Sequence, residues 1–232
     1  DITLDAGGDI ILDADNADIK LQDGGVEFGR ISRVTSDLVI KSMGDNNDIL
    51  FKGVDDSATI TALQLDMSAA GAATFNDMVT IGGSFKKAIH TFTATDAITE
   101  VEHAGRTLLL GEVGGNANVV LTLPDATGSG NIYHFIVSVA MGGSTTYKIQ
   151  VPDANNTITG QIMYLDEDGT AVTSFPTVAA SDTITLNSGT QGGLVGDTLT
   201  LIDIAADKYA VSGNMRVAAG ANPSTPFTAA VS

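Results

Sequence analysis

The sequence predicts an all-β protein in two parts: a shaft of short repeated strands over residues 1–84 and an antiparallel β-sandwich head, jelly-roll-like, over residues 105–232. Three observations indicate this class. A short phrase built on Asp, an apolar residue and Leu recurs along the first part. Apolar residues alternate with polar ones. Clusters of Gly, Asn and Asp separate the alternating runs, and no long amphipathic helix is predicted.

The chain opens on the repeated phrase. Residues 1–6 read Asp-Ile-Thr-Leu-Asp-Ala, and residues 9–14 read Asp-Ile-Ile-Leu-Asp-Ala after a Gly-Gly turn. Looser copies begin at Asp18, Asp37 and Asp48. Because the phrase is complete at the first residue, we expect further copies upstream of it.

Apolar pairs at period two predict one strand with a single buried face in each copy. Strands this short cannot form a core alone, so they must stack on neighbouring coils of the same chain or on other chains. The uneven spacing, roughly eight to twenty residues, favours an intertwined shaft of several chains over a single-chain β-solenoid, which remains the alternative. The predicted pairs are Ile2 and Leu4, Ile10 and Leu12, Ile19 and Leu21, Val26 and Phe28, Leu38 and Ile40, Ile49 and Phe51, Leu63 and Leu65, and Val79 and Ile81.

Residues 85–104 are predicted to connect the shaft to the head. Gly82-Gly83-Ser84 marks the boundary, residues 88–95 alternate as a strand, and residues 96–103 favour a short helix or turn.

The head is predicted from longer runs that are richer in β-branched residues. Asp168-Gly169 is a hairpin signal. Pro223 and Pro226 predict an extended tail from about residue 218. The predicted strands are 106–110, 118–123, 133–139, 147–151, 161–165, 171–173, 182–186, 198–204 and 209–213.

Composition narrows the function. The formal net charge is −17, which disfavours nucleic acid and anionic membrane surfaces as partners. The absence of cysteine excludes disulfides and thiolate zinc sites. No apolar run has the roughly 18–20 residues of a membrane span.

No enzyme is predicted, since the sequence has neither a GxSxG nor a Walker-type loop. His90, His103 and His134 lack the i, i+4 spacing of a helical zinc site and are predicted to be structural or surface residues. Two alternatives remain open. One is a polysaccharide depolymerase that uses paired acids on a β-helix, and the other is a secreted bacterial adhesin.

Candidate site residues are few. Asp13, Asp15 and Asp18 form a dense acidic turn of the kind that can bind calcium, although EF-hand spacing fails at Ala17. Calcium is therefore the one candidate metal, and no other cofactor is predicted. Tyr133, Tyr147, Tyr164 and Tyr209 are the candidate aromatic platforms for a glycan. The head loops best able to vary in order to bind a partner contain Ser129, Asn131, Ser144, Asp166 and Asp168.

Several phrases resemble tailed-bacteriophage fibre proteins, especially those of marine phages. The opening phrase, Asp48–Gly53 and Gly71–Asp77 resemble their shafts. The β-rich head modules at the ends of phage fibres and appendages are similar to Val120–Gly128, Asp182–Asn187, Gly192–Asp197 and Thr225–Phe227.

The resemblance implies a structural protein on the outer surface of a virion, either a tail fibre or a head fibre. It implies a homotrimer whose shaft is an intertwined β-prism or β-helix, attached to other virion proteins through an N-terminal part. The exposed C-terminal knob would attach to a host surface glycan or protein, or would decorate the particle. No catalytic residue is implied.

Overall fold

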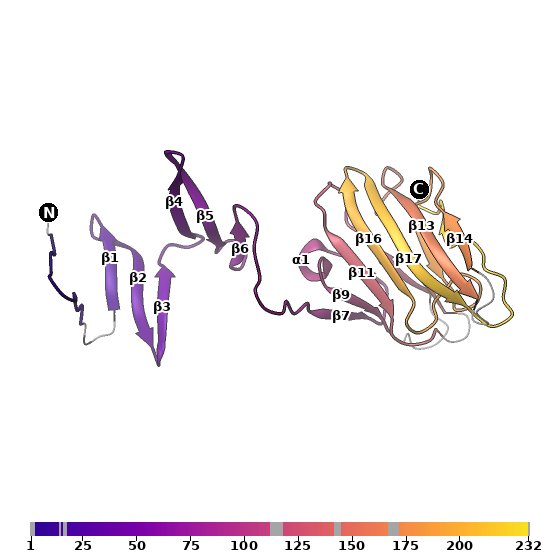
Figure 1. Cartoon of the computed structure of the whole chain (residues 1–232), viewed down its shortest axis with the longest axis horizontal. Coiled ribbons are helices and arrows are strands. Elements are labelled where there is room, and N and C mark those ends of the chain that lie inside the picture. The colour runs from indigo at the N-terminus through magenta and orange to yellow at the C-terminus, as the bar shows by residue number, and fades with distance from the viewer. Residues whose placement is uncertain are drawn as a thin grey trace. The chain divides into compact units, whose positions relative to one another are not determined.

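The computed structural model describes residues 3–13, 15, 18–111, 118–141, 145–166 and 172–231, apart from the side chain of Asp166. The chain divides into two compact units, Asp1–Ser84 and Phe85–Ser232. Eighteen strands and one short helix form the regular structure of the described residues, which confirms the all-β class (Figure 1). That helix has four residues, far fewer than a membrane crossing requires.

The first unit contains two three-stranded antiparallel sheets, each formed by consecutive strands. Tight turns join the strands. Gly24 and Gly25 lie at φ 57° and 84° in one of them, a conformation that glycine adopts without strain. These meanders differ from the coils of a single-chain solenoid. The first sheet consists of β1 (Asp18–Asp23), β2 (Val26–Val34) and β3 (Asp37–Ser42), and the second of β4 (Ile49–Asp55), β5 (Ala58–Asp66) and β6 (Ala72–Phe75).

The described part of the opening repeat contains no strand. Residues 3–13 have no ladder partner in this chain, and neither does the run that contains Val79 and Ile81, although the sequence predicts strands in both. Leu4 and Leu12 are exposed. A strand needs a neighbour to satisfy its backbone groups, and a single chain supplies none here.

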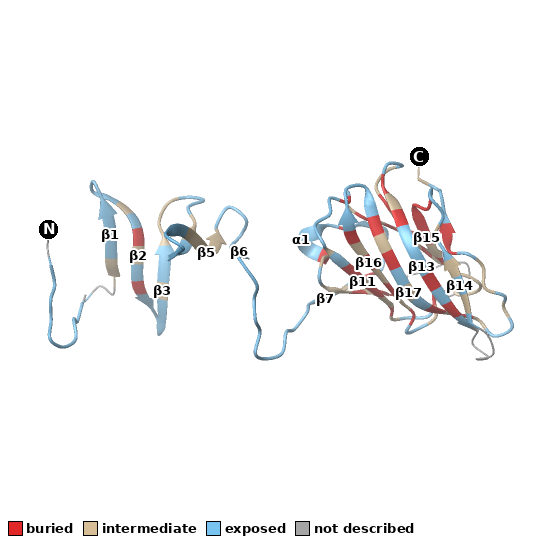
Figure 2. Cartoon of the chain, turned by 45° about the horizontal axis from the view of Figure 1, so that its top comes forward, coloured by how far each residue is buried: buried red, intermediate tan, exposed pale blue. Residues whose placement is uncertain are grey.

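The second unit, the head, consists of two sheets that enclose one hydrophobic core, visible as the buried positions in Figure 2. The seven-stranded sheet has the order β14 (Val172–Pro176), β13 (Thr157–Asp166), β17 (Lys208–Val217), β16 (Thr198–Ala205), β11 (Ile132–Val137), β9 (Thr107–Leu110) and β7 (Ile89–Phe92). The five-stranded sheet has the order β18 (Phe227–Thr228), β15 (Thr183–Leu186), β12 (Thr146–Gln150), β10 (Asn118–Thr122) and β8 (Asp96–Ala97).

The sheets are mixed, so the prediction of a purely antiparallel sandwich is wrong. Strand β9 pairs in parallel with β11, β10 with β12, and β13 with β17. For the first two of these pairs the cause is the path of the chain from β7 to β12, which alternates between the two sheets. Strands that become neighbours in this way run in the same direction. The predicted hairpin at Asp168-Gly169 fits the antiparallel pairing of β13 with β14, although those two residues lie outside the described ones.

Residues 85–104 belong to the head instead of forming a separate connector. They supply β7 and β8, one edge strand to each sheet. Phe92 and Ile98 are buried in the core. The helix α1 (Glu100–His103) follows, and the Thr99 side chain caps it by accepting a hydrogen bond from the Glu102 N–H.

The predicted tail is also partly structural. Strand β18 pairs with β15, and Phe227 is buried. The buried carboxylate of Asp182 accepts hydrogen bonds from the N–H groups of Ala230 and Val231 at 2.8 and 3.1 Å. The end of the described chain is therefore fastened to the head.

Candidate functional site

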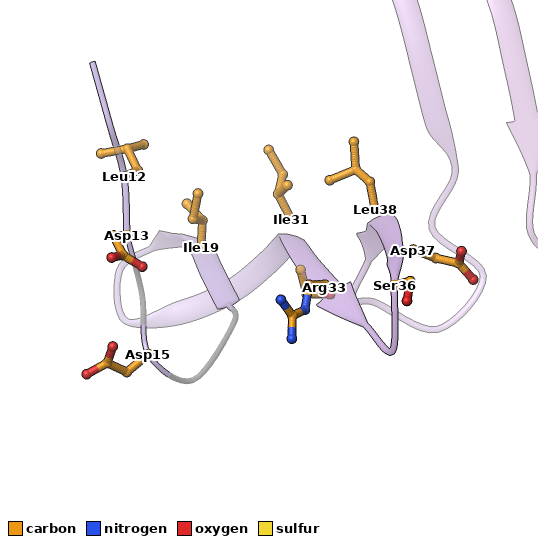
Figure 3. A pocket seen from close by; sticks show the side chains of 10 residues that line it. Leu12, Asp13, Asp15, Ile19, Ile31, Arg33, Ser36, Asp37 and Leu38 are labelled. Carbon is orange, nitrogen blue, oxygen red and sulfur yellow. The ribbon is translucent and has the colours of Figure 1, made fainter. Parts of the chain in front are cut away.

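One face of the first sheet carries a row of three isoleucines. Ile31 on β2 lies opposite Ile19 on β1 and Ile40 on β3. Ile31 and Ile40 are exposed. In Figure 3 the side chains of Leu12, Ile19, Ile31 and Leu38 point in the same direction. The face is therefore apolar and uncovered.

The opposite face of the same sheet is charged. The Arg30 guanidinium pairs with the carboxylates of Asp18 at 2.8 Å and Glu27 at 2.6 Å. Its hydrogen bond to Glu27 lowers the pKa of that carboxyl. The two faces of the first sheet therefore differ, with the isoleucine row on one and this group of ion pairs on the other.

The second sheet repeats this division with other residues. Phe51 on β4, Leu63 on β5 and Phe75 on β6 form one row, and Phe51 and Phe75 are about half exposed. Leu50 and Gln64 occupy the next row and belong to the other face. Both sheets therefore present one uncovered apolar row.

The first unit has no core of its own among its described residues. Every buried hydrophobic side chain that the structure describes belongs to the head, where the first in the sequence is Phe92. Figure 2 shows the same contrast between the mostly exposed first unit and the head. Burial of apolar surface stabilises by about 25 cal/mol per Å², so burial of these apolar rows against another protein surface is strongly favoured. The two apolar rows are the candidate assembly surface.

A hollow of about 630 Å³ lies over the first sheet. Four apolar residues line it, Leu12, Ile19, Ile31 and Leu38 (Figure 3). The rest of the lining is polar or charged and consists of Asp13, Asp15, Ser32, Arg33, Ser36 and Asp37.

The calcium candidates are not gathered into one site. Asp13 and Asp15 line the hollow, whereas Asp18 is engaged by Arg30. Ala17 lies outside the described residues. The described carboxylates at these positions do not form a close group of three.

The loop candidates Ser129 and Asn131 are held by a buried aspartate. Asp203 accepts hydrogen bonds from the N–H groups of Thr127, Gly128 and Ser129 and from the Ser129 hydroxyl, at 2.7–3.1 Å. Burial raises the pKa of Asp203, but these hydrogen bonds outweigh it and lower the pKa to about 2. The Ser129 Oγ in turn accepts from the Asn131 N–H. These hydrogen bonds hold the loop in place, and the Ser129 hydroxyl is engaged in two of them.

The other loop candidates are Ser144, Asp166 and Asp168. Ser144 and Asp168 lie outside the described residues, as does the side chain of Asp166.

The four tyrosines are fully buried, so the expectation of an aromatic glycan platform is wrong. Burial raises the pKa of Tyr133 and of Tyr147 to about 12. The Tyr147 hydroxyl donates to the carbonyls of Phe92 and Gly111, and that of Tyr209 donates to the carbonyl of Pro124. They pack the core because alternation in each strand turns them inward.

Two features of the head have no counterpart in the sequence-based predictions. A hollow of about 360 Å³ on the seven-stranded sheet is lined partly by Met163, Leu165 and Arg216, which neighbouring strands bring together. His90, Asp96 and His103 place their ligand atoms within 4.8 Å of one another. Their separations of six and seven residues match no helical metal motif, so only the fold reveals the group.

No protein-family model matches this chain, and no match was found among curated proteins or among solved structures.

Proposed function

We propose that this chain is a structural virion protein of a tailed phage, a homotrimeric fibre or appendage. Its first unit is the shaft and its second unit is a knob for host-surface attachment or particle decoration. The observation that carries the proposal is the pair of uncovered apolar rows, Ile19–Ile31–Ile40 and Phe51–Leu63–Phe75, in a unit without a core among its described residues. The resemblance of the repeat phrases to phage fibre shafts supports three copies and the virion setting.

Other copies of the same chain are the simplest cover for these rows. Each copy would present two amphipathic sheets, and three copies around one axis would turn every apolar row inward and every charged face to water. Strands from several chains would also give the opening repeat the neighbours that it lacks in one chain. The net charge of −17 keeps such an extended particle soluble.

The knob is suited to a binding or decorating role because it has a hydrophobic core of its own. Its core takes residues from both sheets. Its buried aspartates support loops: Asp182 holds the chain end, Asp203 holds the Thr127–Ser129 loop, and Asp197 accepts from the N–H groups of Gly193 and Leu194. We therefore propose a structural role for these carboxylates and no enzymatic activity.

Immunoelectron microscopy tests the virion assignment. Gold-labelled antibodies raised against the purified chain should decorate projections on particles of the phage that encodes it. Labelling of infected host cells with no labelling of purified particles would overturn the assignment. An antibody that recognises only residues 85–232 should label the outer ends of these projections.

A further inference from the structure

The three elements where the head begins converge on one small cluster of metal-ligating side chains. His90 comes from β7, the edge of the seven-stranded sheet, and Asp96 begins β8, the edge of the five-stranded sheet. His103 is the last residue of α1. One ligand atom from each residue lies within 4.8 Å of the other two.

The His103 ring is fixed at the centre of this group. It is only 1% exposed and stacks on Phe92 with ring centroids 5.3 Å apart, while the His90 ring lies edge-on at 4.4 Å. The Nδ1 atom accepts a hydrogen bond from the Thr99 N–H at 2.9 Å. The other nitrogen, Nε2, is buried and has no hydrogen-bond partner among the described residues. Buried polar atoms are nearly always satisfied, so this Nε2 requires an explanation.

We propose that His90, Asp96 and His103 bind one divalent transition-metal ion, with zinc the best fit. Two imidazoles and one carboxylate are ligands typical of zinc, whereas calcium and magnesium prefer oxygen ligands throughout. The ion binds the His103 Nε2 and so satisfies the one ring atom that the fold leaves unpaired. A water molecule completes the coordination.

The spacing fits this ion after a small closure. Zinc bond lengths of about 2.0–2.1 Å require neighbouring ligand atoms about 3.3–3.5 Å apart in a tetrahedron. His103 is held in place by Phe92 and Thr99, but His90 is half-buried and Asp96 is exposed, so rotation of these two side chains supplies the closure.

Binding also changes which ring nitrogen carries the proton. In the structure Nδ1 is an acceptor, so the neutral His103 ring carries its proton on Nε2. When Nε2 binds the metal, this proton goes to solvent and another from solvent protonates Nδ1, which leaves the ring neutral. The Thr99 Oγ1 lies 3.3 Å from Nδ1 and accepts this new N–H. Metal-bound histidines commonly donate their other ring N–H to such a neighbouring oxygen. The new Nδ1–H takes the place of the Thr99 N–H at this nitrogen, so metal binding costs that hydrogen bond.

The metal ion would link the edge strands of both sheets, β7 and β8, to α1. These are the first three elements of the head in the sequence, so the proposed role of the ion is to stabilise the start of the head. This role does not depend on the virion assignment or on trimer formation.

Titration of the full chain, freed of metal with a chelator, tests the proposal. Zinc measured by calorimetry should bind with one site per chain, and cobalt should give the visible absorption of a site with nitrogen and oxygen ligands. Excess calcium should not displace either ion. His90→Gln and Asp96→Asn should each weaken zinc binding by about tenfold or more.

Two matched control variants distinguish zinc binding at this site from weak, nonspecific binding of the cation to an acidic protein. His134→Gln removes the remaining histidine, which lies on β11 and contacts Thr200 instead of the cluster. Asp77→Asn removes an exposed aspartate whose carboxylate accepts from the next N–H, as that of Asp96 does. Both variants should bind zinc like the unaltered chain. Equal losses in the controls and in the cluster variants would overturn the proposal, as would the absence of a saturable site.

His103→Gln is expected to abolish binding, and circular dichroism reports whether it folds. If it does not fold, the His90 and Asp96 variants decide the matter, since both side chains are accessible to solvent. Nitrogen-15 NMR of the His103 ring supplies an independent readout. Zinc should move the ring proton from Nε2 to Nδ1, and an unchanged ring spectrum at saturating zinc would contradict the assignment.

Discussion

Leu50 and Phe51 are consecutive on β4 and almost equally exposed, at 45% and 49%, yet they belong to opposite faces of the second sheet. Phe51 lies in the apolar row with Leu63 and Phe75, and Leu50 lies in the row of Gln64. In a monomeric first unit, substitutions at these two positions should have similar effects. In an assembled shaft they should differ, because only the face that carries Phe51 is buried against other copies.

Phe51→Asp should therefore abolish assembly, because it places a charge where the apolar row meets other copies. Leu50→Asp should leave assembly intact, since its face meets water. Light scattering of the two purified variants measures the difference. Tyrosine fluorescence reports on the head alone, because all four tyrosines lie there, and it should be unchanged in both. Equal effects of the two substitutions would contradict an interface at the Phe51 face.

Asp203 makes the stability of the head depend on pH in the acidic range. Its pKa is lowered to about 2 in the folded head, against about 3.9 in an unfolded chain. The carboxylate therefore contributes about 2–3 kcal/mol at pH values above the unfolded pKa, and this contribution is lost as pH falls toward 2. Asp203→Asn should lower the free energy of unfolding of the head by about 2 kcal/mol at pH 7 and flatten its dependence on pH between about 5 and 2.

Asp207→Asn is the control for this prediction. Asp207 is exposed and has a positive φ of 60°, which asparagine tolerates. Urea unfolding followed by tyrosine fluorescence compares the two variants. A pH dependence that persists in Asp203→Asn would assign the effect to another group.

The buried tyrosines supply a second matched pair. The Tyr147 hydroxyl donates to the carbonyls of Phe92 and Gly111. Tyr147→Phe removes this donor from both carbonyls, of which that of Phe92 keeps its hydrogen bond from the Gly111 N–H. The substitution should cost about 1–2 kcal/mol. The Tyr164 hydroxyl is buried and has no partner among the described residues. Tyr164→Phe should therefore be neutral or stabilising. Thermal denaturation ranks the two variants, and a larger loss in Tyr164→Phe would show that its hydroxyl is satisfied.

Most head strands could be predicted from the sequence because their runs are rich in β-branched residues and several of them alternate. In β12, Tyr147 and Ile149 point inward while their neighbours do not. The pairing of the strands could not be predicted in this way. Alternation does not reveal that consecutive strands cross between sheets, so the sequence predicts an antiparallel sandwich, whereas β9 and β11 are parallel. The short β8 has too few residues for any pattern to identify it.

The candidate sites also divide into features that a local pattern predicts and features that depend on the fold. The alternating pattern predicts that Ile40 and Phe51 need cover, and the structure leaves both side chains exposed in the single chain. Contacts between residues far apart in the sequence could not be predicted in this way. Asp203 was not a candidate, because its role as an acceptor for the Thr127–Ser129 loop depends on strand β16 passing that loop. The sequence likewise contains no signal that places His90 beside His103.

Mass in solution tests the proposed assembly most directly. Size-exclusion chromatography with multi-angle light scattering should be run on the purified chain at micromolar concentration, with tyrosine fluorescence to confirm a folded head. A trimeric shaft predicts a particle of three times the 23.7 kDa chain mass that stays together on dilution. A soluble monomer of 23.7 kDa with a folded head and a stable first unit would contradict it.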